Sequence, residues 1–322
     1  MIRPGTHVML AVECLRRHMS DEGWQMQIGL EAAGYGLWGR HFAGRDDLDV
    51  REILETVSPE VVIVQDKREW DPVKPGCFEK DVAFEHSSVL ASRDDIFRLT
   101  ICRDAHQDPA YHRMAHEEIG CDAWIVVYDP ATVNRLCPWI PVERMVRTYH
   151  SLDRNAVPPF SPVRLRDCLV SGMLLPTIYP LRERAKQMGI GEYLPHPGYH
   201  ANRTHTPAFL KLLSQYKVSI CTASIFNYAL RKIMESTACG CVVVTDLRET
   251  LPAIDGNLVR VSPEATTAEL QDVVQRAVAD YDPERQREWA RLACDYYHYT
   301  TLYARLAGDI ETMRKKATVH VP

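Results

Sequence analysis

A basic and an acidic residue stand three positions apart in the second half of the chain, at a spacing that suits ligand binding. Lys232 and Glu235 lie within residues 225–246, IFNYALRKIMESTACGCVVVTD. This pattern predicts a helix with both side chains on one face, a left-handed end at Gly240 and a buried strand at 241–245. A carboxylate accepts hydrogen bonds from a ribose diol, and a cation beside helix amides binds a diphosphate. The segment therefore favours a nucleotide site, with an exposed ion pair on an ordinary amphipathic helix as the alternative.

The same stretch resembles the donor-binding segment of GT-B glycosyltransferases. In that family the pattern Lys/Arg-x-x-Glu-x-x-Ala-x-Gly precedes an apolar strand, and residues 232–240 follow it. The resemblance implies that Glu235 accepts hydrogen bonds from the ribose hydroxyls of a nucleotide and that Lys232 faces its diphosphate.

Two further stretches resemble one branch of that family, the spore-maturation type of the group 1 glycosyltransferases. Residues 168–184, CLVSGMLLPTIYPLRER, are similar to its strand and Tyr-Pro-Leu-Arg run, which adds Ser171, Gly172 and Arg182 to the expected donor site. Residues 297–305, YHYTTLYAR, loosely resemble its closing run. An arginine near a helix N-terminus opposes the helix dipole, so a bound anion would explain Arg182. A solvated helix surface is the alternative.

Loop residues near these stretches complete the expected donor site. They are polar or aromatic residues at strand ends, and those not yet named are Thr222, Ser224, Asn227, Tyr228 and His196. Hydroxyl groups at a strand end can bind phosphate, but Ser and Thr also cap helices. His196, His200 and His205 could suggest a metal site, which we disfavour because no carboxylate or cysteine joins them.

A carboxylate after a strand of the first half is the expected general base. Residues 98–104, RLTICRD, resemble the apolar strand of the GT-B family that ends in an aspartate before the cleft, which implies Asp104 as the base. Asp66, after EVVIVQ, is the second choice, and Glu13 after the first strand is the third. A sugar hydroxyl is a poor nucleophile, so a carboxylate would take its proton during attack on the anomeric carbon. Asp104 as a loop or cap residue is the alternative, and a retaining enzyme needs no such base.

The elements that must hold these residues alternate between short apolar strands and amphipathic helices, as in doubly wound parallel sheets. We expect two Rossmann-like α/β domains facing a cleft: 1–155 on the acceptor side and 163–322 on the donor side. A Pro-rich linker, DRNAVPPFSP, separates them. The C-terminal helix either stays with the second domain or crosses back to the first. The predicted strands lie near 7–12, 61–65, 98–102, 123–128, 168–174, 218–221, 241–245 and 258–261. The predicted helices lie near 24–33, 50–57, 110–119, 130–136, 181–188, 206–215, 228–237, 267–281 and 283–316, the last open to a break.

Composition fits a globular protein of two domains and excludes several classes. The 322 residues are 46% apolar and 25% charged, and the ten cysteines form no CxxC pair. Residues 1–150 carry a net charge of −8 and residues 151–322 carry +3, so the second half suits an anionic ligand. GxxxxGK[ST], GxGxxG after the first strand and GxSxG are absent. We expect a cytoplasmic chain with neither a signal peptide nor a membrane span.

These patterns together predict a glycosyltransferase that uses a nucleoside-diphosphate sugar, for example a UDP-sugar, without an obligatory metal or cofactor. The acceptor stays open among a sugar, a protein, a metabolite and a hydroxymethylated DNA base, the last disfavoured by net charge. A GT-B-shaped sugar-nucleotide epimerase and a non-catalytic nucleotide-sugar-binding protein are the alternatives.

Overall fold

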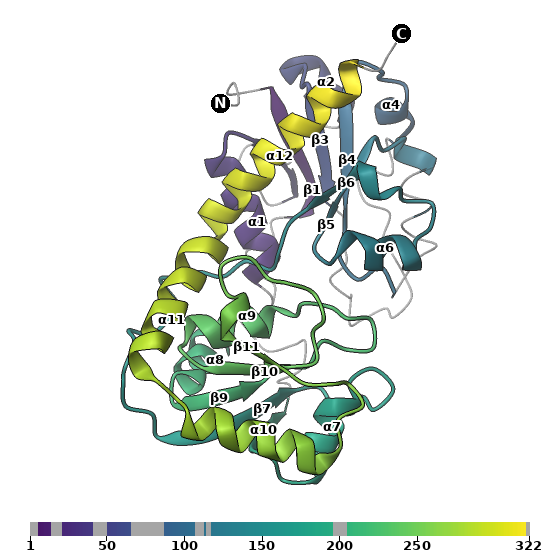
Figure 1. Cartoon of the computed structure of the whole chain (residues 1–322). Helices are drawn as coiled ribbons and strands as arrows, with labels where there is room; N and C mark the ends of the chain where they lie inside the picture. The colour runs from purple at the N-terminus through teal and green to yellow at the C-terminus, as the bar shows by residue number, and fades with distance from the viewer. Residues whose placement is uncertain are drawn as a thin grey trace. The chain divides into compact units, whose positions relative to one another are not determined.

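The protein divides into two compact units. The computed structural model describes residues 6–13, 21–40, 50–65, 87–106, 113, 117–195 and 205–319. Unit 1 combines Met1–Tyr149 with Thr300–Pro322, and unit 2 is His150–Tyr299. The C-terminal helix is therefore grouped almost entirely with the N-terminal sheet (Figure 1).

Unit 1 contains a six-stranded, wholly parallel sheet in the order β2-β1-β3-β4-β5-β6. β4 and β5 are buried along their whole length, as expected for parallel strands covered on both faces. The strands are β1 His7–Glu13, β2 Gly36–Arg40, β3 Val61–Gln65, β4 Phe97–Cys102, β5 Ala123–Val126 and β6 Met145–Arg147. The helices are α1 Asp21–Ala32, α2 Val50–Val57, α4 Ser87–Ala91, α6 Pro130–Leu136, the short η2 Val142–Arg144 and α12 Tyr299–Val319.

One ion pair and one histidine–carboxylate contact tie α12 to the edge of this sheet at which its strands begin. His7 Nε2 lies 3.5 Å from Glu311, and Arg314 lies 3.1 Å from Glu60. The Arg314 and Lys315 cations, against partial burial, hold the pKa of Glu311 at about 2. The last helix is thus anchored by charged groups that local spacing along the chain does not bring together.

Unit 2 contains a five-stranded parallel sheet in the order β11-β10-β9-β7-β8, with a core on each face. One core packs Val170, Val218 and Val244 against α7 and α10, and the other packs Leu169 and Tyr216 against α8 and α9. The strands are β7 Arg166–Gly172, β8 Glu192–Pro195, β9 Tyr216–Ile220, β10 Val242–Thr245 and β11 Leu258–Arg260. The helices are α7 Pro180–Gln187, α8 His205–Leu213, α9 Arg231–Ala238, η3 Asp255–Asn257, α10 Thr267–Ala279 and α11 Pro283–Tyr297.

The strand order places a topological switch point between β7 and β9. The chain leaves β7 through α7 toward β8 on one side, and leaves β9 through α9 toward β10 on the other. Because the two helices cover opposite faces, the loops after β7 and β9 diverge and leave room beyond the carboxyl ends of these strands. The corresponding point of unit 1 lies between β1 and β3.

The long helical segment predicted at 283–316 is broken, as the sequence left open. His298 separates α11 from α12, with φ −58° and ψ 131°. Leu152 pairs with the break: its amide donates to the Tyr297 carbonyl at 3.0 Å, and the Tyr299 amide donates to the Leu152 carbonyl at 3.1 Å. Backbone groups freed by the break are thereby satisfied.

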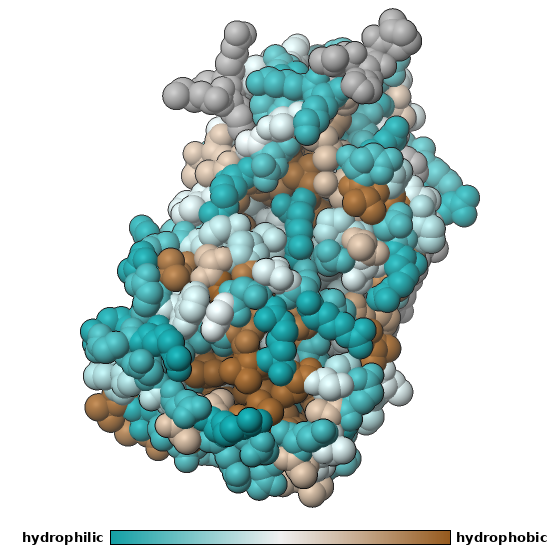
Figure 2. All heavy atoms as spheres, viewed as in Figure 1, coloured by the Kyte–Doolittle hydropathy of each residue, from teal (hydrophilic) through white to brown (hydrophobic). Residues whose placement is uncertain are grey.

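The surface and the helix lengths can be compared with those of a membrane protein for the part of the chain that the structure describes. The face in Figure 2 is mostly hydrophilic, with hydrophobic residues in patches between polar side chains. None of the described helices is both long enough and apolar enough to cross a membrane. The described cysteines are free, and all but Cys294 are buried.

Candidate functional site

Two cations converge above a glycine at the switch point of unit 2. Gly172 ends β7 with φ +117°. A Cβ atom built on it would overlap Lys232 Nζ and lie 2.8 Å from Arg182 Nη1. The backbone conformation favours glycine here, and the ends of the two flexible cationic side chains fill the space that a Cβ would take. The sequence placed all three residues in the donor site, and the structure brings them together.

Arg182 is held in a buried position by few contacts. It is 2% exposed, its Nη1 donates to the Met173 carbonyl at 2.9 Å, and its guanidinium lies 4.0 Å from the centre of the Tyr179 ring. Its Nε is buried and has no hydrogen-bond partner among the residues described. Burial lowers the pKa of Arg182, and nearby Tyr179, Cys221 and Asp246 only partly offset that effect. This is an under-compensated cation near the N-terminus of α7.

Lys232, in the first turn of α9, is under-compensated too. Burial, followed by the charge of Arg182, lowers its pKa to about 8. Its nearest aromatic neighbour is the Phe209 ring, whose centre lies 6.0 Å from Nζ. None of the described carboxylates comes within ion-pair distance of it. Two neighbouring cations without a partner anion form a site that an added anion would stabilise.

Two buried hydroxyls lie at the carboxyl ends of β7 and β9, the adjacent strands of the switch point. Ser171 is next to last in β7, and Thr222 follows the end of β9 by two residues; they are 2% and 0% exposed. Neither hydroxyl has a hydrogen-bond partner in the described part of the chain. An unpaired buried hydroxyl costs about 1–3 kcal/mol, so it indicates a missing partner such as a ligand oxygen.

Glu235 is buried in α9 and pairs with a residue that the sequence analysis did not single out. It is 6% exposed, and its Oε1 lies 3.0 Å from Arg231 Nε. The i, i+4 partner therefore takes the contact, while Lys232 at i−3 turns toward Gly172. The Arg231 guanidinium fixes the orientation of a carboxylate that was expected to bind ribose.

The loop between β9 and α9 makes a tight turn at the mouth of this site. Ser224 and Asn227 both have positive φ, +66° and +59°. Ser224 Oγ accepts from the Phe226 amide at 3.2 Å, and Asn227 Oδ1 accepts from the Arg248 amide at 2.8 Å. Because this turn delays the helix, Tyr228 lies before α9, not within it as predicted, and it is 2% exposed. Ser224 and Asn227 thus serve the loop's own backbone.

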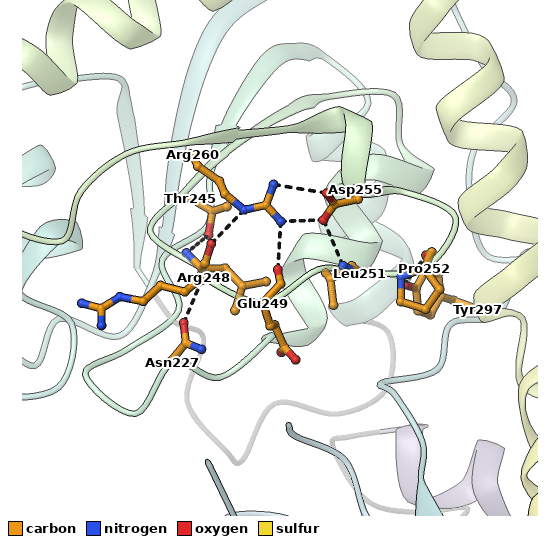
Figure 3. Close-up of polar contacts among 10 residues, drawn as sticks. Asn227, Thr245, Arg248, Glu249, Leu251, Pro252, Asp255, Arg260 and Tyr297 are labelled. Carbon is orange, nitrogen blue, oxygen red and sulfur yellow. Dashed lines mark hydrogen bonds and ion pairs between the residues drawn. The ribbon is translucent and has the colours of Figure 1, made fainter. Parts of the chain in front are cut away.

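A second arginine organises the loop after β10 (Figure 3). Arg260 donates to the carbonyls of Leu247 and Glu249 at 3.1 and 2.8 Å, and its two terminal nitrogens contact Asp255 at 2.5 and 3.4 Å. Asp255 in turn accepts from the Leu251 amide at 3.0 Å. We call Arg260, Asp255 and the 247–251 backbone they bind the loop clasp.

Asp246, the first residue of that loop, was missed as a site residue. It is 7% exposed and accepts a 2.6 Å hydrogen bond from the Ala223 amide. Burial raises its pKa, which the Ala223 hydrogen bond and the charges of Arg182 and Arg248 partly counter. An acidic residue directly after a buried strand was the available signal, the one used for Asp104 in the first half.

The predicted base lies in unit 1, after β4. Asp104 Oδ1 accepts a 3.3 Å hydrogen bond from the Tyr128 hydroxyl, which comes from just beyond β5. Asp66 and His196 lie outside the described residues, as does His200. Glu13 ends β1, but its side chain is not described. In the described part of the chain, no three His, Cys, Asp or Glu side chains cluster as metal ligands.

The architecture is that of known GT-B glycosyltransferases. No family model matches the sequence, and no curated protein does. A sucrose-phosphate synthase from Thermosynechococcus elongatus superposes with a TM-score of 0.56 at 11% identity, covering 99% of this chain and 100% of that one. AviGT4, a glycosyltransferase involved in avilamycin A biosynthesis, gives 0.53 at 13% identity, covering 97% and 98%. At these identities the likeness establishes the fold.

Proposed function

We propose that the protein is a glycosyltransferase that binds a nucleoside-diphosphate sugar on unit 2. The observation that carries the proposal is the convergence of Arg182 and Lys232 over Gly172, both buried without an anionic partner. A diphosphate would supply that partner. The GT-B fold and the location at the switch point of the sheet support the same ligand class.

In this proposal, each part of the nucleotide-sugar donor is bound by particular side chains of unit 2. The diphosphate oxygens meet Arg182, Lys232 and the hydroxyls of Ser171 and Thr222, and the ribose diol meets Glu235. Fixed cations at the diphosphate stabilise the charge that develops on the leaving nucleoside diphosphate, so bond cleavage is eased by preorganised electrostatics. His196 and Tyr228 stay candidates for the rest of the donor.

Deprotonation of the acceptor falls to a carboxylate of unit 1 in this proposal. Asp104 is the first candidate, because the Tyr128 hydroxyl orients it beyond the end of β4. Asp66 is the second. Asp104→Asn is expected to abolish transfer while leaving the dissociation constant of the donor unchanged; unchanged turnover in that variant would return the role to Asp66 or to no base at all.

The proposal is tested by calorimetry against UDP, GDP, ADP and TDP. The wild-type protein should bind at least one of them, and Arg182→Met should weaken that binding roughly 10- to 100-fold, since a hydrogen bond to a charged group is lost. Lys211→Met, which removes an exposed lysine of α8 in the same unit, is the matched control and should bind as the wild type does. A wild-type protein that binds none of the four excludes the proposed donor site.

Ribose recognition is tested separately with a 2′-deoxynucleotide. If Glu235 binds the diol, the wild type should prefer the ribonucleoside diphosphate to its 2′-deoxy form, and Glu235→Gln should reduce that preference. Equal preference in both proteins would remove the role from Glu235. Incubation of the donor without an acceptor distinguishes transfer from epimerisation, because only an epimerase would isomerise the sugar.

A further inference from the structure

The Asp246 carboxylate has one oxygen engaged and is buried at the end of β10. Asp246 Oδ1 accepts the Ala223 amide at 2.6 Å, which fixes the side chain against the loop between β9 and α9. Apart from its own amide, no other group in the described part of the chain donates a hydrogen bond to this carboxylate. The second oxygen therefore keeps its acceptor capacity.

The surroundings of this carboxylate suit a polar part of the ligand. Asp246 and Arg182 are close enough for each charge to shift the other's pKa. Arg182 is in turn 2.8 Å from the position that a Gly172 Cβ would take, beside Lys232. Asp246 also follows β10 at the carboxyl end of the sheet, the end at which Gly172 closes β7 on the other side of β9, and among the described residues it forms no ion pair with either cation. A group that adjoins a diphosphate and offers hydroxyl donors is the natural complement.

The other carboxylate near the cations and the loop side chains already have partners, whereas the hydroxyls of Ser171 and Thr222, which have none among the described residues, are assigned to the diphosphate. Glu235 Oε1 is paired with Arg231 and lies in the helix whose first turn carries Lys232. Asn227 Oδ1 is occupied by the Arg248 amide, and Ser224 Oγ by the Phe226 amide. Among the described acidic side chains near the two cations, Asp246 alone has an uncommitted oxygen and no cationic partner.

We propose that Asp246 recognises the sugar of the donor by accepting hydrogen bonds from its hydroxyl groups. The inference rests on the proposed donor site and adds to it the residue that distinguishes a nucleotide sugar from the bare nucleoside diphosphate. A carboxylate accepts two neighbouring hydroxyls better than a neutral amide does, because a hydrogen bond to an ionised acceptor is the stronger one. Fixing Oδ1 by the Ala223 amide preorganises the remaining oxygen for that contact.

The test compares two ligands that differ only in the sugar. Calorimetry measures the dissociation constants of UDP and UDP-glucose for the wild type and for Asp246→Asn; if the panel selects adenine or guanine, ADP and ADP-glucose or GDP and GDP-glucose are used. The asparagine retains an oxygen for the Ala223 amide, so the loop should hold. We expect the variant to bind UDP as the wild type does and UDP-glucose roughly 10- to 100-fold more weakly.

Two controls make each outcome decisive. Asp255→Asn removes a carboxylate of the same loop that belongs to the loop clasp, and it should leave the ratio of the two dissociation constants unchanged. Thermal unfolding of Asp246→Asn checks the fold: removing a buried carboxylate whose pKa is raised should not lower the melting temperature. If Asp246→Asn changes both ligands equally, or neither, the role in sugar recognition is wrong while the donor site stands. If the wild type binds no nucleoside diphosphate, the donor site itself is wrong.

Discussion

Arg260 and Arg182 lie near the same sheet of unit 2 and are satisfied in opposite ways. In the loop clasp, Arg260 is partly exposed and binds two carbonyls and a carboxylate (Figure 3). At the switch point, Arg182 is 2% exposed, binds one carbonyl and neighbours a second cation. In the loop clasp, the charge of Arg260 is matched by the Asp255 carboxylate, and the clasp holds a loop. In the cation site, the charges of Arg182 and Lys232 have no anionic partner among the described residues. Such uncompensated charge costs stability and is typical of a ligand-binding site.

Lys232→Met tests the cation site, and of the changes considered it should have the largest effect. The lysine is charged in the folded protein below pH 8 although burial opposes that charge, and a shift from 10.5 to about 8 corresponds to a few kcal/mol. Methionine should therefore raise the free energy of unfolding while weakening nucleoside-diphosphate binding roughly 10- to 100-fold. Urea titration and calorimetry measure the two. Lower stability together with unchanged binding would make Lys232 an ordinary structural residue.

The pH dependence of nucleoside-diphosphate binding also tests the role of the Lys232 charge. The pKa of Lys232 is about 8 in the free protein, and a bound diphosphate would raise it by favouring the cation. Affinity should be steady between about pH 7, where the terminal phosphate is still fully ionised, and pH 8, and it should fall by up to about tenfold per pH unit above pH 8. For folding the sign is reversed: stability should rise from pH 8 toward 10.5, where the unfolded chain still binds the proton. Lys232→Met should flatten both profiles; an unaltered binding profile would contradict the assignment.

Arg260→Met tests the loop clasp with the same kind of substitution, a cationic residue replaced by methionine. It leaves the Leu247 and Glu249 carbonyls and the Asp255 carboxylate without their donor, so the free energy of unfolding should fall by about 1–2 kcal/mol. Nucleoside-diphosphate binding should change little. If Arg260→Met removed binding as strongly as Lys232→Met does, the distinction between clasp and site would fail.

Asp255→Asn should have the smallest effect on the free energy of unfolding, and that effect should be confined to a defined pH range. Partial burial alone would raise the pKa of Asp255, but hydrogen bonds from Arg260 and the Leu251 amide outweigh it and hold the pKa below 3.8. The charged pair therefore stabilises the fold above that value, and its contribution is lost as pH falls further. For a pair this exposed we expect less than about 1 kcal/mol near neutral pH. Stability curves of the variant and the wild type should converge in acid; a constant gap would show that charge is not the cause.

Most of the fold followed from local patterns, and the strands that did not are edge strands. The predicted strands at 61–65 and 98–102 match β3 and β4 within one residue, because buried parallel strands are continuous apolar runs. β2, β6 and β8 were not predicted. β2 includes two glycines, β6 has three residues, and β8 is partly exposed along its length. An edge strand needs only one partner, so its sequence carries a weak signal.

By itself the sequence determined which residues share an element: Lys232 and Glu235 on one helix, Gly240 at its end with φ +78°, and Pro180 at the start of α7. Such relations depend on spacing along a helix or strand, which the chain fixes locally. Only the tertiary structure decided that Lys232 meets Arg182 over Gly172, that Arg231 takes Glu235, and that the Ala223 amide binds Asp246. These contacts depend on strand order and on competition among partners for burial and charge, and neither is encoded in the spacing of any single segment.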